Sequence, residues 1–218
     1  SFIYKKIDYL YFGSNSATDW WKKNYPWMDI SKNLIMYNGV SVKSKKKIKK
    51  INKKIIISFV GRLENENNPK FFIDIAERYL ELYNNAIFNL YGDGPMLKDL
   101  KKKNRNKNIN FFGWVNKDVI YKKSNIVLIT SPINNFPYVA LEAKSYGIPV
   151  ISSSKGDIKK IVKNNVDGFI SETNSINKMI TLIEKTIKNY NPLSKNAIKR
   201  SKKFDIKESC KKFWQTIK

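Results

Sequence analysis

The sequence contains no histidine, and this absence excludes several kinds of active site at once. A Ser-His triad, a histidine metal site and an imidazole general base each require that side chain. Cysteine is almost as rare: the single Cys210 excludes an internal disulfide and fits a reducing compartment. We expect Cys210 to pack in a C-terminal helix. With so few candidate ligands, the sequence shows no obvious metal cluster.

Long apolar runs are missing as well. No stretch approaches the roughly 20 apolar residues that a membrane-spanning helix needs. The first six residues, SFIYKK, carry neither a secretory signal nor an initiator methionine. We therefore expect the sequence to be part of a longer, cytoplasmic protein.

Acidic residues are scarce: 18 Asp and Glu face 42 Lys and Arg, which gives a formal net charge of +24. Because Lys, Asn and Ile are enriched everywhere, a compositional bias of the whole proteome is one explanation. A surface this positive also attracts anionic lipid headgroups or nucleic acid. A nucleic-acid-binding module fits less well, since Lys dominates Arg and the aromatic residues are scattered. Among the functional explanations, we prefer peripheral association with the inner face of the cell membrane.

From Ile55 onward, short apolar runs alternate regularly with helical patterns. At 218 residues, 42% of them hydrophobic, the chain can bury a sizeable core. The alternation predicts the α/β class, with a Rossmann-like, doubly wound parallel sheet of about six strands and flanking helices. The predicted strands are Ile55–Val60, Ile87–Tyr91, Ile109–Phe112, Ile126–Ile129, Val150–Ser152 and Gly168–Ile170. The predicted helices are Lys70–Tyr83, Leu97–Leu100, Val119–Tyr121, one that opens at Pro137, Ile176–Ile187 and Ile206–Ile217.

The composition also divides the chain into segments. Before the alternation begins, we predict two short strands and one aromatic helix, over Ile7–Phe12, Leu34–Tyr37 and Ala17–Tyr25. An almost pure Lys run follows, which cannot be buried and should be solvated. The segments are 1–42, the tail end of a preceding unit; 43–54, a Lys-rich linker; 55–205, the sheet domain; and 206–218, a C-terminal helix.

The stretch from Ser131 to Val150 is the most informative part of the chain. The strand before it ends in a loop of Thr, Ser, Pro and Asn, and Pro137 fits the first turn of the next helix. A loop at the carboxyl end of a strand that leads into a helix N-terminus is a natural phosphate site. Glu142, about one turn into that helix, can accept hydrogen bonds from a ribose diol. The arrangement predicts a nucleoside diphosphate ligand.

Glycine-bearing turns follow four of the predicted strands and belong to one edge of a parallel sheet. They begin at Gly61, Gly92, Gly113 and Lys155. Glycine at such turns permits positive φ and close approach of a ligand to the backbone. Arg62, directly after the first of these strands, has a guanidinium that can reach a diphosphate over the crevice.

Seven motifs occur in one order along the chain. They are Tyr37-Asn38-Gly39-Val40, Gly61-Arg62-Leu63, Gly92-Asp93-Gly94-Pro95, Phe112-Gly113, Phe136-Pro137 with Leu141-Glu142-Ala143, Gly147-Ile148-Pro149-Val150 and Asn165-Val166-Asp167-Gly168-Phe169. This set resembles the C-terminal, nucleotide-sugar-binding domain of retaining GT-B glycosyltransferases, the family called glycosyl transferases group 1. The resemblance covers essentially the whole chain from about Tyr9 onward.

The resemblance implies a donor site for a nucleoside diphosphate sugar, UDP- or GDP-linked, with no tightly bound cofactor or metal. Arg62 would contact the diphosphate, Glu142 would hold the ribose hydroxyls, and the turn at Gly113-Trp114 would lie beside the base. The implied catalytic residues are Arg62, Glu142 and Asn134. The implied donor-binding residues are Gly61, Arg62, Lys70, Gly113, Trp114, Asn135, Phe136, Pro137, Tyr138, Val139 and Glu142.

The sequence departs from the family pattern at three positions. The first of the family's two paired Glu residues, eight positions before Glu142, corresponds to Asn134, which leaves a neutral amide near the reacting carbon. The family's phosphate-binding Lys corresponds to Asn67, although Lys70 lies close by and could reach the same phosphate. A further Glu is replaced by Lys160. We favour a site adapted to an unusual donor over one that has lost activity.

The sequence therefore predicts the donor-binding domain of a retaining glycosyltransferase that acts on a glycan or lipid-linked acceptor in polysaccharide biosynthesis. Its partners would be the nucleotide-sugar donor, an acceptor-binding N-terminal domain and an anionic membrane surface, but not nucleic acid. Without the acceptor domain, we expect poor turnover. The alternative is a non-catalytic relative that serves as a partner subunit, suggested by Asn134 and Asn67.

Overall fold

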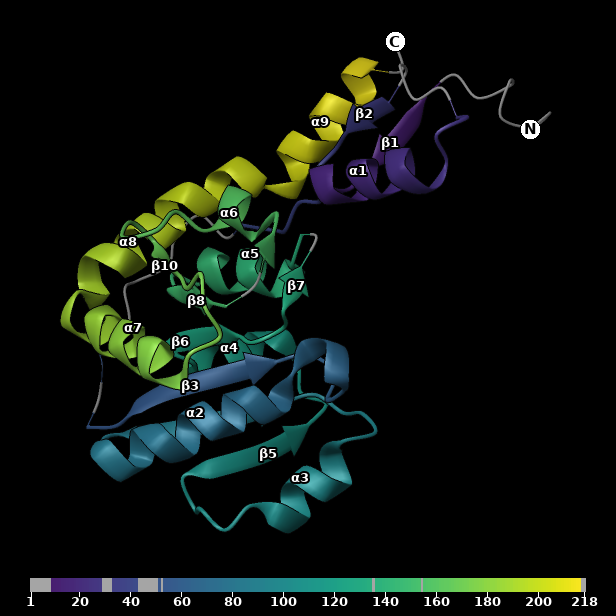
Figure 1. Ribbon diagram of the computed structural model, residues 1–218. Helices are drawn as coiled ribbons and strands as arrows, with labels where there is room; N and C mark the ends of the chain where they lie inside the picture. Colours follow the sequence, from purple (N-terminus) through teal and green to yellow (C-terminus); the bar gives the residue numbers. More distant parts are fainter. Residues whose placement is uncertain are drawn as a thin grey trace.

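The computed structural model of the protein describes residues 9–28, 33–42, 51, 53–134, 136–153 and 155–216. Its central element is a parallel sheet in the order β10-β8-β6-β3-β4-β5, enclosed by helices (Figure 1). The strand sequences are nearly continuous apolar runs because parallel strands are covered on both faces. The six strands are β3 (Ile55–Val60), β4 (Ala86–Tyr91), β5 (Ile109–Gly113), β6 (Ile126–Ile129), β8 (Val150–Ser152) and β10 (Gly168–Ile170).

The predicted fold class is confirmed, since every neighbouring pair in this sheet is parallel. The chain builds outward from β3 through β4 to β5, and then returns to place β6 on the other side of β3. β8 and β10 continue outward from β6. The two directions of construction diverge between β3 and β6, and at such a switch point a doubly wound sheet opens a ligand crevice.

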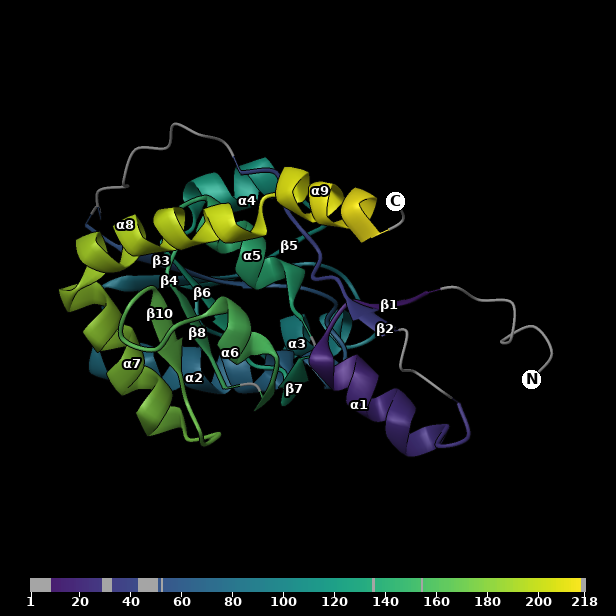
Figure 2. The same ribbon diagram turned by 90° about the horizontal axis from the view of Figure 1, so that it is seen from above.

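Helices cover both faces of the sheet (Figure 2). After β3 the chain forms α2 (Pro69–Leu82) on one face, and after the β6 region it forms α5 (Tyr138–Ser145) on the other. α7 (Ile176–Lys188) packs beside α2, while α4 (Lys117–Lys123) lies on the same side as α5 (Figure 2). The remaining helices of this domain are α3 (Leu97–Lys103), α6 (Ile158–Ile161) and α8 (Tyr190–Ser201).

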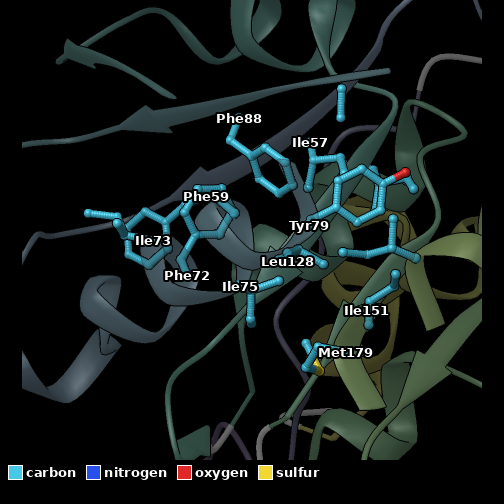
Figure 3. Packing of buried hydrophobic residues seen from close by; sticks show 14 of the residues in the cluster. Ile57, Phe59, Phe72, Ile73, Ile75, Tyr79, Phe88, Leu128, Ile151 and Met179 are labelled. Atoms are coloured by element: carbon cyan, nitrogen blue, oxygen red, sulfur yellow. The ribbon is translucent and has the colours of Figure 1, made fainter. Parts of the chain in front are cut away.

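Aromatic side chains fill the core between α2, α7 and the sheet (Figure 3). Phe72 and Tyr79 of α2 both lie edge-on to Phe88 of β4, with ring centroids 5.7 and 5.6 Å apart. Ile57 of β3 and Met179 of α7 are fully buried in the same cluster. The helical spacing of apolar residues on α2 predicts this inward face. Packing here holds β3 in place, and with it the turn that follows β3.

A second, two-stranded parallel sheet is separate from the six-stranded one. It pairs β1 (Leu10–Phe12) with β2 (Asn33–Ile35), and α1 (Asn15–Asn24) packs against it. α9 (Ile206–Thr216) extends from the body of the molecule onto this small sheet (Figure 1). There the rings of Tyr11 and Phe213 lie 5.2 Å apart. The first and last described segments are therefore neighbours in space.

One 12-residue helix, α8, and several short elements were not predicted from the sequence. α8 was missed because Asn191-Pro192 near its start suggests a turn, yet the first turn of a helix tolerates Pro since its N–H groups have no intrahelical acceptor. Leu193 and Ala197, four residues apart, supply its buried face. The other unpredicted elements are α6, β7 (Ile133–Asn134), β9 (Lys155–Gly156) and the 3₁₀ turns η2 (Asn65–Asn67) and η3 (Lys202–Phe204).

Cys210 lies on the predicted C-terminal helix, α9, but the expectation that it packs there is wrong, because the residue is exposed. Ser209 and Phe213 occupy the inward face of that helix instead, and the Ser209 hydroxyl donates to the carbonyl of Tyr37 at 3.2 Å. Most of the predicted linker at 43–54 lies outside the described residues. Among the helices that are described, none combines the length and apolar character needed to cross a membrane.

A buried ion network anchors α5 from behind. Lys144 of α5 and Asp167 are both inaccessible to solvent and lie 2.7 Å apart. The same carboxylate oxygen contacts Arg200 of α8 at 2.5 Å, and the other oxygen accepts from the N–H of Lys163. Burial lowers the pKa of Lys144, although the Asp167 carboxylate opposes that shift. The network ties the helix that carries Glu142 to α8 and to the turn before β10.

Replacing Asp167→Asn should lower the free energy of unfolding by about 3–5 kcal/mol, because Lys144 then stays buried without a carboxylate. Urea denaturation of the parent and the variant measures the change. The matched control is Asp74→Asn, which breaks the exposed Lys70–Asp74 pair and should cost less than about 1 kcal/mol. Equal losses in the two variants would contradict the structural role of the buried network.

Candidate functional site

A cavity of about 510 Å³ opens at the carboxyl ends of β3 and β4, between the turns that follow them and the helices α4 and α5. Arg62 from the turn after β3, Trp114 from the turn after β5, and Glu142 from α5 all line it. The structure thus brings together three residues that are far apart in the sequence. A separate cavity of about 440 Å³ lies between β2 and α9, where Leu34 and Phe213 contribute to its wall.

Glycine is required where the turns after β3 and β4 touch. Gly92 has φ of +135°, and a Cβ at this position would lie 1.9 Å from the carbonyl oxygen of Gly61. Gly94 is constrained in the same way, since its Cβ would lie 2.6 Å from the carbonyl oxygen of Leu63. These backbone contacts hold the turn that carries Arg62 at the mouth of the cavity.

Arg62 presents an exposed guanidinium to this mouth. Its side chain is 74% exposed, and it pairs with Glu64 at 3.3 Å. Exposed pairs of this kind contribute at most about 1 kcal/mol, so an incoming anion can replace the carboxylate. Asn67 braces the same turn, because its amide donates to the carbonyl of Arg62 at 3.0 Å. Thr130, just beyond β6, donates in turn to the carbonyl of Asn67 at 3.1 Å.

The carboxylate of Glu142 has two partners on α4. Tyr121 donates from Oη to Oε2 of Glu142 at 2.8 Å, and the ammonium of Lys117 lies 3.4 Å from Oε1. Burial raises the pKa of Tyr121 well above its ordinary value, and the nearby Glu142 carboxylate adds to this effect. The phenol therefore keeps its proton and acts as a donor. Neither Tyr121 nor Lys117 was predicted, because only the tertiary placement of α4 beside α5 brings them to Glu142.

A smaller cavity of about 50 Å³ adjoins the first, and Val60 lines both. Ser131, Pro137 and Val139 line it at the start of α5. The first N–H groups of a helix have no intrahelical acceptor, and Pro137 at the N-cap makes no side-chain cap hydrogen bond. The start of α5 therefore directs N–H groups and the positive end of the helix dipole toward this space.

The loop before α5 is held by a short parallel pairing of β7 with β9. In this pairing Asn134 is in register with Gly156, so its backbone lies beside the turn that follows β8. The side chain of Asn134 and the whole of Asn135 lie outside what the structure describes.

Other predicted donor-site residues are placed in different surroundings. Lys70 lies on the exposed side of α2, 2.9 Å from Asp74, and lines a groove between α2 and α3 rather than the cavity of Arg62. Phe136 is buried and stacks on Tyr37, with ring centroids 4.7 Å apart, so its ring connects the sheet domain with the N-terminal segment. Tyr138 is half-exposed at the first position of α5.

The turn after β5 forms the outer wall of the larger cavity. Gly113 has φ of +66°, and a Cβ there would meet nothing within 4 Å. Trp114 follows it with 90% of its surface exposed, which is unusual for so large an apolar side chain. Across the described parts of the chain, no group of three His, Cys, Asp or Glu side chains is arranged to hold a metal ion.

The chain is similar to known proteins in sequence. The family model described as glycosyl transferases group 1 matches residues 41–204. The chain is 34% identical over 152 residues to the UDP-Gal:alpha-D-GlcNAc-diphosphoundecaprenol alpha-1,3-galactosyltransferase of Escherichia coli, a match that covers 65% of this chain and 39% of that protein. It is 29% identical over 162 residues to an alpha-1,4-N-acetyl-D-galactosaminyltransferase of Campylobacter jejuni, which covers 71% of this chain and 45% of the relative. The chain thus spans less than half the length of these two relatives.

Solved structures share the fold. The pneumococcal O-GlcNAc transferase GtfA, solved in complex with UDP and GlcNAc, superposes with a TM-score of 0.82 at 16% identity, over 98% of this chain and 45% of that one. Anabaena Alr3699/HepE in complex with UDP-glucose gives a TM-score of 0.83 at 17% identity, over 96% of this chain and 63% of that one. The six-stranded parallel sheet and its helices therefore match one half of a GT-B fold.

The close approach of the turns after β3 and β4 makes the site sensitive to a single added methyl group. Gly92→Ala should destabilise the protein by roughly 3 kcal/mol, because its Cβ meets the Gly61 carbonyl and its φ is positive. Gly113→Ala, the control, has positive φ but open space, and should cost about 1 kcal/mol. Urea denaturation compares the two variants, and a Gly92→Ala loss no greater than that of Gly113→Ala would show that the turns can separate.

Proposed function

This chain belongs to the family of glycosyl transferases group 1, and we propose that it forms the part of a retaining glycosyltransferase that binds the nucleoside diphosphate sugar. An acceptor-binding domain would complete the enzyme, and residues 1–42 would be the end of that domain. The separate sheet of β1 and β2 supports this division, since its two strands have no partner in the six-stranded sheet.

The observation that carries the proposal is the convergence of Arg62 and Glu142 on one cavity of about 510 Å³. A nucleoside diphosphate combines a ribose diol, which suits a carboxylate acceptor, with phosphates, which suit a guanidinium and helix N–H groups. The start of α5, beside Val60 in the adjoining cavity, supplies those N–H groups. No other described cavity combines these features.

The proposed chemistry follows from this placement. The bond between the anomeric carbon and the diphosphate oxygen breaks as an acceptor hydroxyl oxygen bonds to that carbon. Negative charge develops on the leaving diphosphate, which takes up the proton of the acceptor hydroxyl. Arg62, once the diphosphate has replaced Glu64 as its partner, and the N–H groups at the start of α5 stabilise that charge. Glu142 holds the ribose, and the exposed Trp114 lies beside the base. Lys70 lines the groove between α2 and α3 and not this cavity, so it is not among the proposed phosphate contacts.

We propose UDP as the nucleotide and a lipid-linked glycan as the acceptor. UDP is present in the GtfA and HepE complexes that share the fold, and UDP-Gal and a diphosphoundecaprenol acceptor appear in the name of the Escherichia coli relative. The net charge of +24 supports this choice of acceptor, because a positive surface is attracted to the anionic inner face of a membrane.

The alternative function is a partner subunit without catalytic activity of its own, and the observation that favours it is Asn134. A carboxylate at this position would stabilise an oxocarbenium-like transition state electrostatically, whereas an amide only donates and accepts hydrogen bonds. Asn67, the second departure from the family pattern, supports an adapted enzyme instead, since it braces the turn of Arg62.

Arg62→Ala and Glu142→Ala should each weaken UDP binding at least about tenfold, because each removes hydrogen bonds to a charged group. Isothermal titration of the protein with UDP, and with GDP in parallel, measures this loss and tests the choice of base. Binding of UDP at least as tight as that of GDP is expected.

The control for these titrations is Arg78→Ala. Arg78 is an exposed arginine of α2 that pairs with Glu81 at 2.7 Å, and its loss should leave the UDP affinity unchanged. Failure of the parent protein to bind either nucleotide at millimolar concentration would refute the proposed function. So would unchanged affinity in both the Arg62 and Glu142 variants.

Asn134→Glu, made in the protein together with its acceptor domain, distinguishes the adapted enzyme from the inactive subunit. For an adapted site we expect sugar transfer to fall at least about tenfold, because the new carboxylate replaces a hydrogen-bonding amide beside the anionic diphosphate. Initial rates with the physiological donor measure the effect, and Asn177→Glu, at an exposed position of α7, controls for the added charge. A large gain in activity would instead support the alternative, a partner subunit without catalytic activity of its own.

A further inference from the structure

The described partners of Glu142 differ in how firmly they are held. Tyr121 is fully buried, and its ring packs at 5.4 Å against that of Tyr146. The hydroxyl of Tyr146 in turn donates a hydrogen bond to Asp118, which lies on α4 about one turn before Tyr121. The side chain of Lys117, by contrast, is 65% exposed, and its ammonium lies 3.4 Å from Oε1 of Glu142, a longer contact than that of Tyr121. The contact with Tyr121 is therefore fixed by the core, whereas the contact with Lys117 is easily exchanged.

The Glu142 carboxylate can accept more hydrogen bonds than the one that Tyr121 donates. It offers about four lone-pair sites, and the hydrogen bond from Tyr121 occupies one site on Oε2. Glu142 lines the cavity, and among the contacts of the described residues the partner of its Oε1 is the exposed Lys117. A vicinal diol can donate to such an oxygen in place of an ammonium held at 3.4 Å.

We propose that Tyr121 is a positioning residue for the ribose of the donor: it fixes Oε2 of Glu142, so that Oε1 faces the ribose hydroxyls, which displace Lys117. The inference rests on the proposed function and assigns Tyr121 no direct contact with the nucleotide. It follows from the burial of the phenol and its 2.8 Å hydrogen bond. Tyr121 on α4 thus contributes to the selection of ribose over deoxyribose, although the carboxylate that accepts the hydrogen bonds belongs to Glu142 on α5.

The test compares Tyr121→Phe with the parent protein in titrations with UDP and with 2′,3′-dideoxy-UDP. Phe keeps the ring but removes the hydroxyl, so UDP should bind roughly tenfold more weakly. The dideoxy nucleotide has no ribose hydroxyls for Glu142 to accept from, and its affinity should change less than about twofold. The ratio of the two affinities is the readout, because a general packing defect would weaken both.

Two further variants make the test decisive. Tyr146→Phe removes a hydroxyl from the same aromatic pair, one that donates to Asp118, and should leave the affinity ratio unchanged. In a Glu142→Ala background, adding Tyr121→Phe should cause no further loss of UDP affinity, since the two residues act as one unit. Thermal denaturation confirms that each variant is folded at the titration temperature.

The outcomes separate this inference from the function on which it rests. A parent protein that binds no nucleotide refutes the donor site itself. If the parent binds UDP and the inference is wrong, Tyr121→Phe will bind UDP as the parent does, or will lose affinity for UDP and the dideoxy nucleotide equally. Additive losses in the double variant would likewise show that Tyr121 acts independently of Glu142.

Discussion

Two neighbouring strands, β3 and β6, send the chain to opposite faces of the sheet, and the site depends on this divergence. After β3 the chain turns through Gly61 and Arg62 toward α2, and beyond β6 it runs through a loop into α5. Since neither helix can lie over the gap between the two strands, the edge stays open at this point. A guanidinium and a helix start therefore face the same space without any local feature that directs one to the other.

The open edge needs rigid walls, and the core supplies them from both sides. The aromatic cluster of Phe72, Tyr79 and Phe88 holds β3 and β4 against α2. On the opposite face, the buried pair of Lys144 and Asp167 holds α5 from the side away from the cavity. Both arrangements fix the backbone of the strands and of α5. The functional groups at the edge are therefore positioned by packing in the core behind them.

Two positions that the resemblance marks as departures from the family pattern, Asn67 and Asn134, have defined backbone contacts in the structure. Asn67, which the resemblance sets at the position of a phosphate-binding Lys, donates its side-chain amide to the carbonyl of Arg62. This hydrogen bond fixes the turn that carries Arg62. Asn134, held through β7 in register with Gly156, keeps a place beside the same edge.

The sequence alone determined the α/β class, the six strands and the order of the motifs, because apolar runs and glycine turns are local signals of burial and backbone conformation. It also placed Arg62 and Glu142 at one edge, since all strand-to-helix turns of a parallel sheet share an edge. Only the tertiary structure decided that Tyr121 and Lys117 meet Glu142, and that Lys70 pairs with Asp74 outside the cavity. Contacts between helices depend on how side chains pack across the fold, and no periodicity within either helix encodes them.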